Sequence, residues 1–141
     1  MIMSESTDRL IKDLVDGWNE HDANKVAALY GSGYEEEDVA AADPHRGVNA
    51  ARGTMILYLR AFPDLQLLVE DIVVQDNCVA MSWILCGTHR GRLMNIPATG
   101  RTVRVKGVSI MTIADGRITR TRRIWDLAGL LRAFGLLPEL S

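Results

Sequence analysis

The sequence predicts a single α+β domain in which helices pack against one face of a bent, mostly antiparallel sheet. Helical periodicity is concentrated before residue 63 and again near the end of the chain, whereas consecutive strand patterns fill residues 65–126. The chain has 141 residues, a length that suits one hydrophobic core, so residues 1–141 are expected to form one domain. Hydrophobic residues make up 48% of the chain and charged residues 24%, which is typical of a globular protein.

Helices are predicted where apolar side chains recur every three or four residues. Their expected spans are 7–20, 23–30, 47–62 and 127–135. In the first of them, Leu10, Leu14 and Trp18 belong to one apolar stripe. A weak strand over residues 34–42, which contains an acidic run at 35–38, lies between the second helix and the third.

Strands are predicted for most of the second half of the chain. Their expected spans are 65–75, 78–89, 101–114 and 117–126. The dipeptide Asp115-Gly116 between the last two is the strongest hairpin signal in the sequence. Four consecutive antiparallel strands after three helices predict a bent sheet with helices on one face, and we expect a pocket between its concave face and the long first helix.

Charge and hydropathy argue against two classes of partner. The net charge is −2, so bulk electrostatics gives no reason to expect nucleic-acid binding. No apolar run approaches the roughly 20 residues that span a bilayer, and therefore no membrane partner is expected. The first residues lack the basic start and apolar stretch of a secretory signal, so a cytoplasmic protein is expected.

The cysteines and histidines predict neither a disulfide nor a metal site. Cys78 and Cys86 fall on one predicted strand, where eight residues span roughly 26 Å, and a disulfide needs Cα atoms within about 7 Å. The three histidines are scattered and show no metal-ligand spacing with these cysteines. No phosphate-binding loop or dinucleotide fingerprint follows a predicted strand, so no cofactor is expected.

An ordered series of short motifs runs through the chain. It includes the segments 87–91 (GTHRG), 96–101 (IPATGR), 115–118 (DGRI) and 126–135 (DLAGLLRAFG), preceded by 18–22 (WNEHD) and 61–64 (AFPD). In their order and spacing, these segments resemble the SnoaL-like polyketide cyclase and ester cyclase family. The resemblance implies the cone-shaped fold shared with nuclear transport factor 2 and steroid Δ-isomerases. It also implies a reaction without a metal or organic cofactor.

The resemblance assigns a role to one carboxylate. In the characterised cyclases of the family, an aspartate on the last strand is the acid/base of an intramolecular aldol closure, and Asp126 matches its position. The chain also departs from the family pattern. Arg122 stands where relatives often carry tryptophan, Arg120 replaces a common glutamate, and Thr112 lies near the position of a pocket histidine.

Two residues are candidates for catalysis. In an apolar pocket the carboxylate of Asp126 would lose hydration, which would raise its pKa and make it a better base. The alternative is that Asp126 caps the helix that begins at Leu127. His89 is expected on the same face of its strand as the apolar side chains, where it could donate a hydrogen bond to a substrate oxygen or relay a proton. Its alternative is a histidine at a strand end, hydrogen-bonded to a loop.

Six residues are candidates for binding the substrate. Five offer broad apolar surface for a pocket wall or, alternatively, for plain core packing: Trp18, Tyr30, Tyr58, Trp83 and Met111. The sixth is Arg122, which on the inner face would leave a gap to Asp126 that a ligand carboxylate could fill. The favoured alternative has a β-bulge that turns Arg122 outward. There it would join Arg104, Lys106, Arg117, Arg120 and Arg123 on a solvated or subunit-facing surface.

Two functions follow as hypotheses. The first is an enzyme that binds a small apolar or aromatic carbonyl compound and catalyses aldol-type cyclisation or isomerisation with Asp126. The second is a non-catalytic binding module with the same pocket, and a weaker third is a dimerisation module. A homodimer is expected in each case, because a sheet covered on one side leaves an open apolar face.

Overall fold

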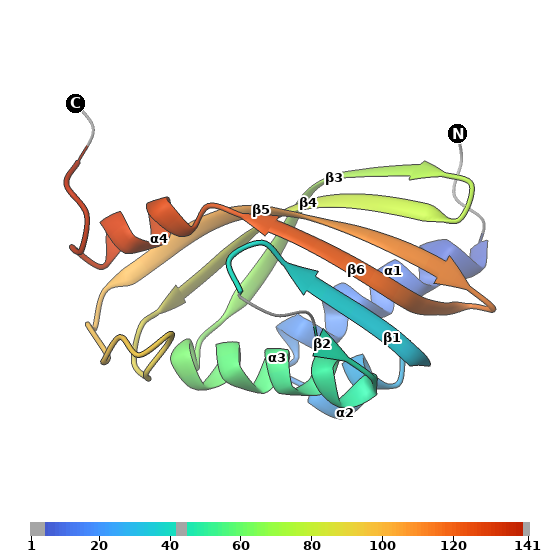
Figure 1. Ribbon diagram of the computed structural model, residues 1–141, viewed down its shortest axis with the longest axis horizontal. Helices are drawn as coiled ribbons and strands as arrows, with labels where there is room; N and C mark the ends of the chain where they lie inside the picture. Colours follow the sequence, from blue (N-terminus) through green and yellow to red (C-terminus); the bar gives the residue numbers. More distant parts are fainter. Residues whose placement is uncertain (1–4, 42–44, 140–141) are drawn as a thin grey trace.

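The computed structural model describes residues 5–41 and 45–139, and it confirms the predicted α+β class. Its helices are α1 (Glu5–Asn19), α2 (Ala23–Ala27), α3 (Val48–Ala61) and α4 (Leu127–Ala133). Its strands are β1 (Tyr30–Asp38), β2 (His45–Arg46), β3 (Gln66–Gln75), β4 (Cys78–Thr88), β5 (Thr102–Ala114) and β6 (Arg117–Trp125). Figure 1 shows α1, α2 and α3 on one side of a twisted sheet and α4 beyond the end of β6.

The six strands form one sheet in the order β2-β1-β6-β5-β4-β3. Strands β3 to β6 are antiparallel neighbours, as predicted for these four consecutive strands. Strand β1 pairs with β6 in parallel, with Glu37 opposite Arg122 and Asp38 opposite Arg123. The first and last long strands of the chain are therefore adjacent in the middle of the sheet.

Two features of the sheet differ from the prediction. Strand β1 begins at Tyr30, four residues before the expected start, because α2 ends at Ala27 and the segment 31–33 continues as an extended chain rather than as a helix stop. The two-residue strand β2 was not predicted, since two residues are too few to show an alternation.

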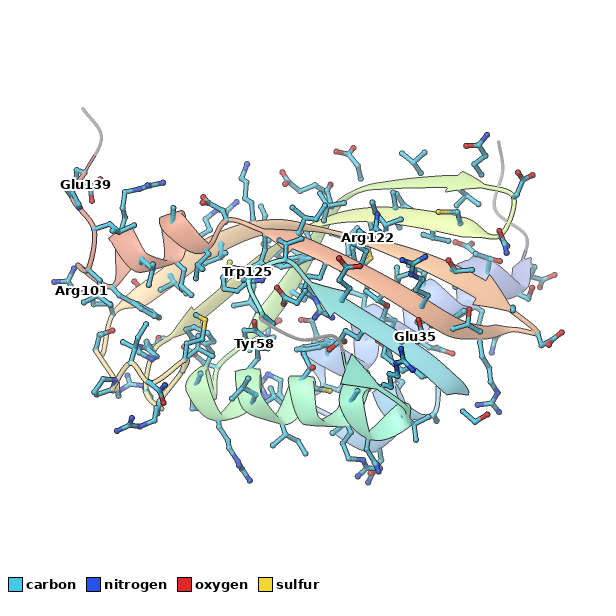
Figure 2. All side chains as sticks on the ribbon, viewed as in Figure 1. Glu35, Tyr58, Arg101, Arg122, Trp125 and Glu139 are labelled. Atoms are coloured by element: carbon cyan, nitrogen blue, oxygen red, sulfur yellow. The ribbon has the colours of Figure 1, made fainter. Side chains whose placement is uncertain are left out.

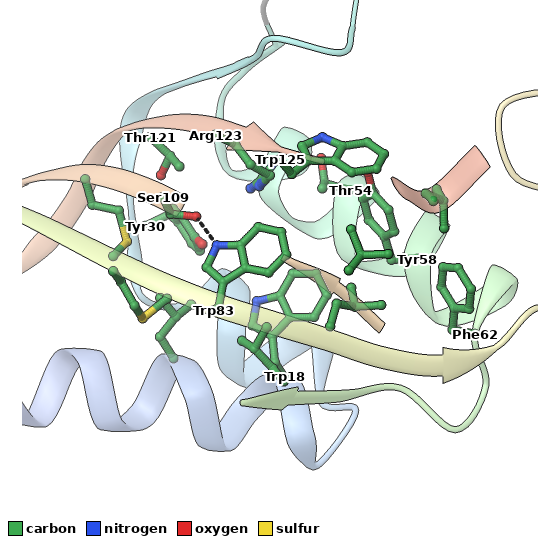
Figure 3. A pocket seen from close by; sticks show the side chains of 17 residues that line it. Trp18, Tyr30, Thr54, Tyr58, Phe62, Trp83, Ser109, Thr121, Arg123 and Trp125 are labelled. Atoms are coloured by element: carbon green, nitrogen blue, oxygen red, sulfur yellow. Dashed lines mark hydrogen bonds between the residues drawn. The ribbon is translucent and has the colours of Figure 1, made fainter. Parts of the chain in front are cut away.

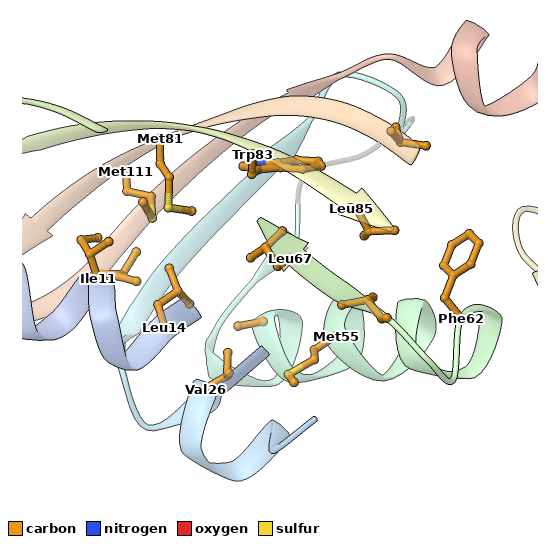
Figure 4. Packing of buried hydrophobic residues seen from close by; sticks show 14 of the residues in the cluster. Ile11, Leu14, Val26, Met55, Phe62, Leu67, Met81, Trp83, Leu85 and Met111 are labelled. Carbon is orange, nitrogen blue, oxygen red and sulfur yellow. The ribbon is translucent and has the colours of Figure 1, made fainter. Parts of the chain in front are cut away.

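The core lies between the concave face of the sheet and the helices. Strand β4 turns alternate residues toward the helices, and Val79, Met81, Trp83 and Leu85 are all buried there. Figure 4 shows Ile11 and Leu14 of α1 and Met55 of α3 facing this apolar row.

A bulge in β6 decides which of its side chains reach the interior. Thr112 pairs with Arg120 but the next residue, Ile113, pairs with Ile118, so Thr119 is an extra residue without a partner position. Because side chains alternate along a strand, one extra residue exchanges the two faces of everything that follows. After the bulge Thr121, Arg123 and Trp125 line the interior, whereas Arg120 and Arg122 are exposed.

The structure also bears on the predictions about the cysteines and about membrane-spanning segments. Cys78 and Cys86 lie at the two ends of β4 and are both free, as the strand spacing predicted. Among the residues that the structure describes, no helix is long and apolar enough to cross a membrane.

Candidate functional site

An apolar cavity lies between the concave face of the sheet and helices α1, α3 and α4 (Figure 3). It contains about 760 Å³ of space free of protein atoms, its open mouth included. The aromatic members of its wall are Trp18, Tyr30, Tyr58, Phe62, Trp83 and Trp125. Leucine, valine and methionine side chains supply most of the remainder.

Five of the six predicted binding residues line this cavity: Trp18, Tyr30, Tyr58, Trp83 and Met111. Their location is where a bound molecule would touch them, and their role in binding stays a prediction. The sixth, Arg122, is exposed, and its Nε lies 3.4 Å from Glu37 Oε2. It points away from Tyr58 and Trp125, which face each other edge to face at 6.5 Å (Figure 2). The outward orientation of Arg122 favoured from the sequence is therefore confirmed.

The indole of Trp83 forms one flat side of the cavity. Its Nε1 donates a hydrogen bond to Ser109 Oγ at 3.0 Å, which fixes the ring across β5. Gly107 is the cross-strand partner of both Trp83 and Trp125, and a Cβ added at this glycine would lie 2.4 Å from the Trp83 ring. Only a residue without a side chain lets the indole lie directly on the strand.

The charged group in the wall is Arg123, which the sequence had placed on the solvated outer surface. The structure corrects this placement, because the bulge at Thr119 turns Arg123 inward, where its side chain is 12% exposed. Nη2 donates a hydrogen bond to Glu36 Oε1 at 3.1 Å, and Nη1 lies 3.6 Å from Asp38 Oδ2.

Glu36 is fixed as the buried counter-charge of Arg123. It is 2% exposed and accepts hydrogen bonds from Tyr34 Oη at 3.0 Å and Thr54 Oγ1 at 2.6 Å. Burial alone would raise the pKa of this carboxyl group, but the guanidinium of Arg123 and these hydrogen bonds outweigh it and hold the pKa below its usual value. The pair is therefore ionised at neutral pH.

The carboxylate of Asp38 holds Trp125 in the wall. It accepts from the Trp125 Nε1 at 2.9 Å through Oδ1 and also from the Ala40 amide at 2.9 Å. Burial raises the pKa of Tyr58 to about 12 and raises the pKa of Tyr30 as well, so both phenols stay protonated and can donate hydrogen bonds. Among the described residues of the wall there is no carboxylate, and Arg123 is the one cation.

The structure corrects the expected location of Asp126. Its side chain is exposed, is not part of the wall, and accepts a hydrogen bond from the Gly129 amide at 2.8 Å as the N-cap of α4. The reason is again the bulge in β6, because it brings Trp125 rather than Asp126 to the inner face.

His89 lies behind the cavity wall and not in it. The ring is completely buried, stacks on Phe134 at 4.1 Å with an angle of 14°, and lies 5.8 Å from Phe62, which does line the cavity. Nδ1 is 3.0 Å from Thr99 Oγ1, and Nε2 makes no hydrogen bond to a described residue. The loop-bonded histidine considered as the alternative is the arrangement observed.

Comparison with known proteins agrees with the fold. Residues 8–134 match the family model described as SnoaL-like polyketide cyclase. The chain belongs to the SnoaL-like polyketide cyclase family. It is 29% identical over 130 residues to the aklanonic acid methyl ester cyclase DnrD of Streptomyces peucetius, covering 89% of this chain and 88% of that one.

Solved structures of similar proteins show the same fold. TsrD from Streptomyces laurentii is 26% identical and superposes with a TM-score of 0.86, covering 97% of this SnoaL-like chain and all of the other (100%). A protein with a ketosteroid isomerase-like fold from Catenulispora acidiphila, 13% identical, superposes with a TM-score of 0.78 over 94% of this chain and 96% of its own. The expected cone-shaped fold is therefore confirmed.

The burial of His89 predicts a pH dependence of stability. Burial lowers the pKa of His89 in the folded protein below that of an exposed histidine. As the pH falls below about 6.5 the unfolded chain binds a proton that the folded protein excludes, so the free energy of unfolding decreases in that range. Chemical denaturation at pH 7.5, 6.5 and 5.5 should show a steeper loss for the wild type than for His89→Asn. Equal slopes would contradict the assignment.

The close approach at Gly107 predicts a cost for any side chain there. Gly107→Ala forces Trp83 to move, and overpacking of this kind costs about 1–3 kcal/mol in the free energy of unfolding. The matched control is Gly33→Ala, where an added Cβ meets nothing within 4 Å. Urea denaturation followed by tryptophan fluorescence compares the two, and equal stabilities of both variants would disprove the packing argument.

Proposed function

We propose that this chain catalyses a cyclase-type reaction, an aldol closure or an isomerisation, on a small apolar carbonyl compound held in the cavity. The observation that carries the proposal is an aromatic-lined cavity with one cation, Arg123, among the described residues of its wall, in a chain of the SnoaL-like family. An aklanonic acid methyl ester cyclase and a nogalonic acid methyl ester cyclase, both from Streptomyces, are among its relatives. No compartment follows from these observations, and a cytoplasmic location stays a prediction.

The cavity supplies the conditions that such a reaction needs. A proton leaves the carbon beside one carbonyl group, the resulting enolate forms a carbon–carbon bond to a second carbonyl, and the oxygen of that group takes up a proton, so no oxidant or reductant is consumed. The apolar wall excludes water from the enolate. The phenols of Tyr30 and Tyr58 and the guanidinium of Arg123 offer donors to oxygens that gain charge.

In this proposal Asp126 is the acid/base, and its support is the family motif that it shares. Its carboxylate follows Trp125 directly in the chain but lies on the other side of the wall. Catalysis by Asp126 requires that it release the Gly129 amide and turn toward the cavity, because a base must reach the proton that it removes. Capping and catalysis are separable at this residue, because asparagine caps a helix about as well as aspartate but cannot accept the proton.

A pair of variants at Asp126 tests its role. Asp126→Asn should keep the stability of the wild type and lose at least about 100-fold in turnover of an aromatic keto ester, the typical contribution of a general acid or base. Asp126→Ala should also lose about 1 kcal/mol in the free energy of unfolding, since it removes the cap. Turnover is measured by mass spectrometry of the products. A wild-type rate for Asp126→Asn would show that Asp126 is not part of the mechanism.

A non-catalytic binding module is the second candidate, and the absence of a carboxylate from the described wall favours it. Two carboxylates that contact wall residues, Glu36 and Asp38, are already hydrogen-bonded to Arg123 and to Trp125. A binding module would retain keto esters unchanged, so the recovery of only starting material from wild type and variants alike supports this candidate over the enzyme.

We also propose that the chain forms a homodimer through the outer face of the sheet. Four apolar side chains on β3, β5 and β6 are exposed there: Leu68, Val73, Ile110 and Ile124. Ile110 pairs across the sheet with the outward Arg122, so it lies on the face opposite the cavity. An exposed apolar face of this kind is typical of an interface between two copies.

The dimer proposal predicts an effect of charge at the centre of that face. The wild type should sediment as a dimer and Ile110→Lys as a monomer, because a buried unpaired ammonium is costly. Leu57→Lys is the matched control, because Leu57 is an apolar residue on α3 that is at least as exposed as Ile110, and this variant should remain dimeric. A monomeric wild type in analytical ultracentrifugation would refute the dimer.

A further inference from the structure

Thr121 Oγ1 and Arg123 Nη1, two polar atoms on the inner face of β6, make no full hydrogen bond to a described residue, although Nη1 lies 3.6 Å from Asp38 Oδ2 and the Thr121 side chain lies near the Tyr34 hydroxyl. Thr121 is 3% exposed. Both residues line the cavity, and since they are two positions apart on the strand they face the same way (Figure 3). Buried polar groups are nearly always hydrogen-bonded, so this pair points to an oxygen supplied by a ligand.

The charges around Arg123 decide what kind of oxygen fits. Glu36 Oε1 lies 3.1 Å from Nη2, and Asp38 Oδ2 lies 3.6 Å from Nη1. One guanidinium therefore already faces two carboxylates. A ligand carboxylate at Nη1 would come to lie beside Asp38, and like charges at such distances repel strongly in a poorly hydrated site. An uncharged carbonyl oxygen accepts the same hydrogen bond without this repulsion.

We propose that Arg123 and Thr121 form an oxygen subsite that selects a ketone or ester carbonyl over a free carboxylate. The inference rests on the proposed function in placing the ligand in this cavity, but it concerns recognition and not turnover. The indole faces of Trp18 and Trp83 would receive the hydrocarbon part of the same molecule. The subsite differs from the sequence hypothesis, in which Arg122 met a ligand carboxylate.

Three naphthalene probes with one ring system test the selection. They are 2-acetonaphthone with an uncharged acceptor, 2-naphthoate with a carboxylate, and 2-ethylnaphthalene with no acceptor. By isothermal titration calorimetry at pH 7, the wild type should bind the ketone about tenfold more tightly than the hydrocarbon, the order expected for one hydrogen bond from a charged donor. It should bind 2-naphthoate more weakly than the ketone.

The sharpest variant is Asp38→Asn, which removes one negative charge and keeps an amide oxygen for Trp125 Nε1 and the Ala40 amide. It should bind 2-naphthoate about tenfold more tightly than the wild type does, with the affinity for 2-acetonaphthone changed by less than about threefold. The matched control is Glu37→Gln, the neighbouring carboxylate, which pairs with the outward Arg122. It should change neither affinity.

A second variant guards against misfolding. Thr121→Val keeps the shape of the side chain and removes at most a weak contact with Tyr34, so the variant should fold normally by circular dichroism. It should lose part of the ketone's advantage over the hydrocarbon, about threefold or more. Arg123 itself is a poor target, because its removal leaves Glu36 buried without a cation.

The subsite is overturned if the wild type prefers 2-naphthoate, if Asp38→Asn leaves the order of the three affinities and their ratios unchanged, or if none of the probes binds. Its failure is distinguishable from that of the proposed function. A protein that shows the ketone preference but turns over no keto ester contradicts the cyclase proposal alone. An active enzyme without the preference contradicts the subsite alone.

Discussion

The interior of this protein depends on the buried ion pair between Glu36 of β1 and Arg123 of β6. Either charge alone would be costly at this depth, and the hydrogen bonds from Tyr34 and Thr54 complete the environment that makes the carboxylate stable there. The pair also fixes the inner face of β6, because Arg123 can reach Glu36 only from that side. This one interaction therefore holds Arg123 in the cavity, where it is the one cation among the described residues of the wall.

Most of the fold could be predicted because its elements carry local signals. The alternation of β4 and the turn at Asp115-Gly116 are unambiguous, and both turn residues have the positive φ (52° and 71°) that such hairpins require. The start of β1 was not predictable in the same way. Its first residues are rich in glycine, and its partner β6 lies almost ninety residues further along the chain, so no local pattern records the parallel pairing.

The aromatic part of the site was predictable, whereas its charged part was not. Large apolar side chains such as Trp83 can be predicted to face the interior from their residue type and from their position in the strand alternation. The placement of Arg123 and Asp126 depends instead on one extra residue, Thr119, and the alternation of a strand does not reveal where a bulge lies. A signal did exist in the alternation of charges. Glu37 and Asp38 face opposite sides of β1, and each lies opposite an arginine of β6, but the match is visible only once the two strands are known to be neighbours.

The adjacency of β1 and β6 has a consequence for how the chain reaches its native state. Strand β6, which lies between β1 and β5 in the sheet, is the last strand to be synthesised. Until residues 117–125 have left the ribosome, β1 has no strand to pair with on that edge, and Glu36 has no cation beside it. Long-range pairings of this kind form slowly and expose strand edges in the meantime. A nascent or truncated form of this protein would thus present an open, acidic edge that molecular chaperones or proteases can distinguish from the finished molecule.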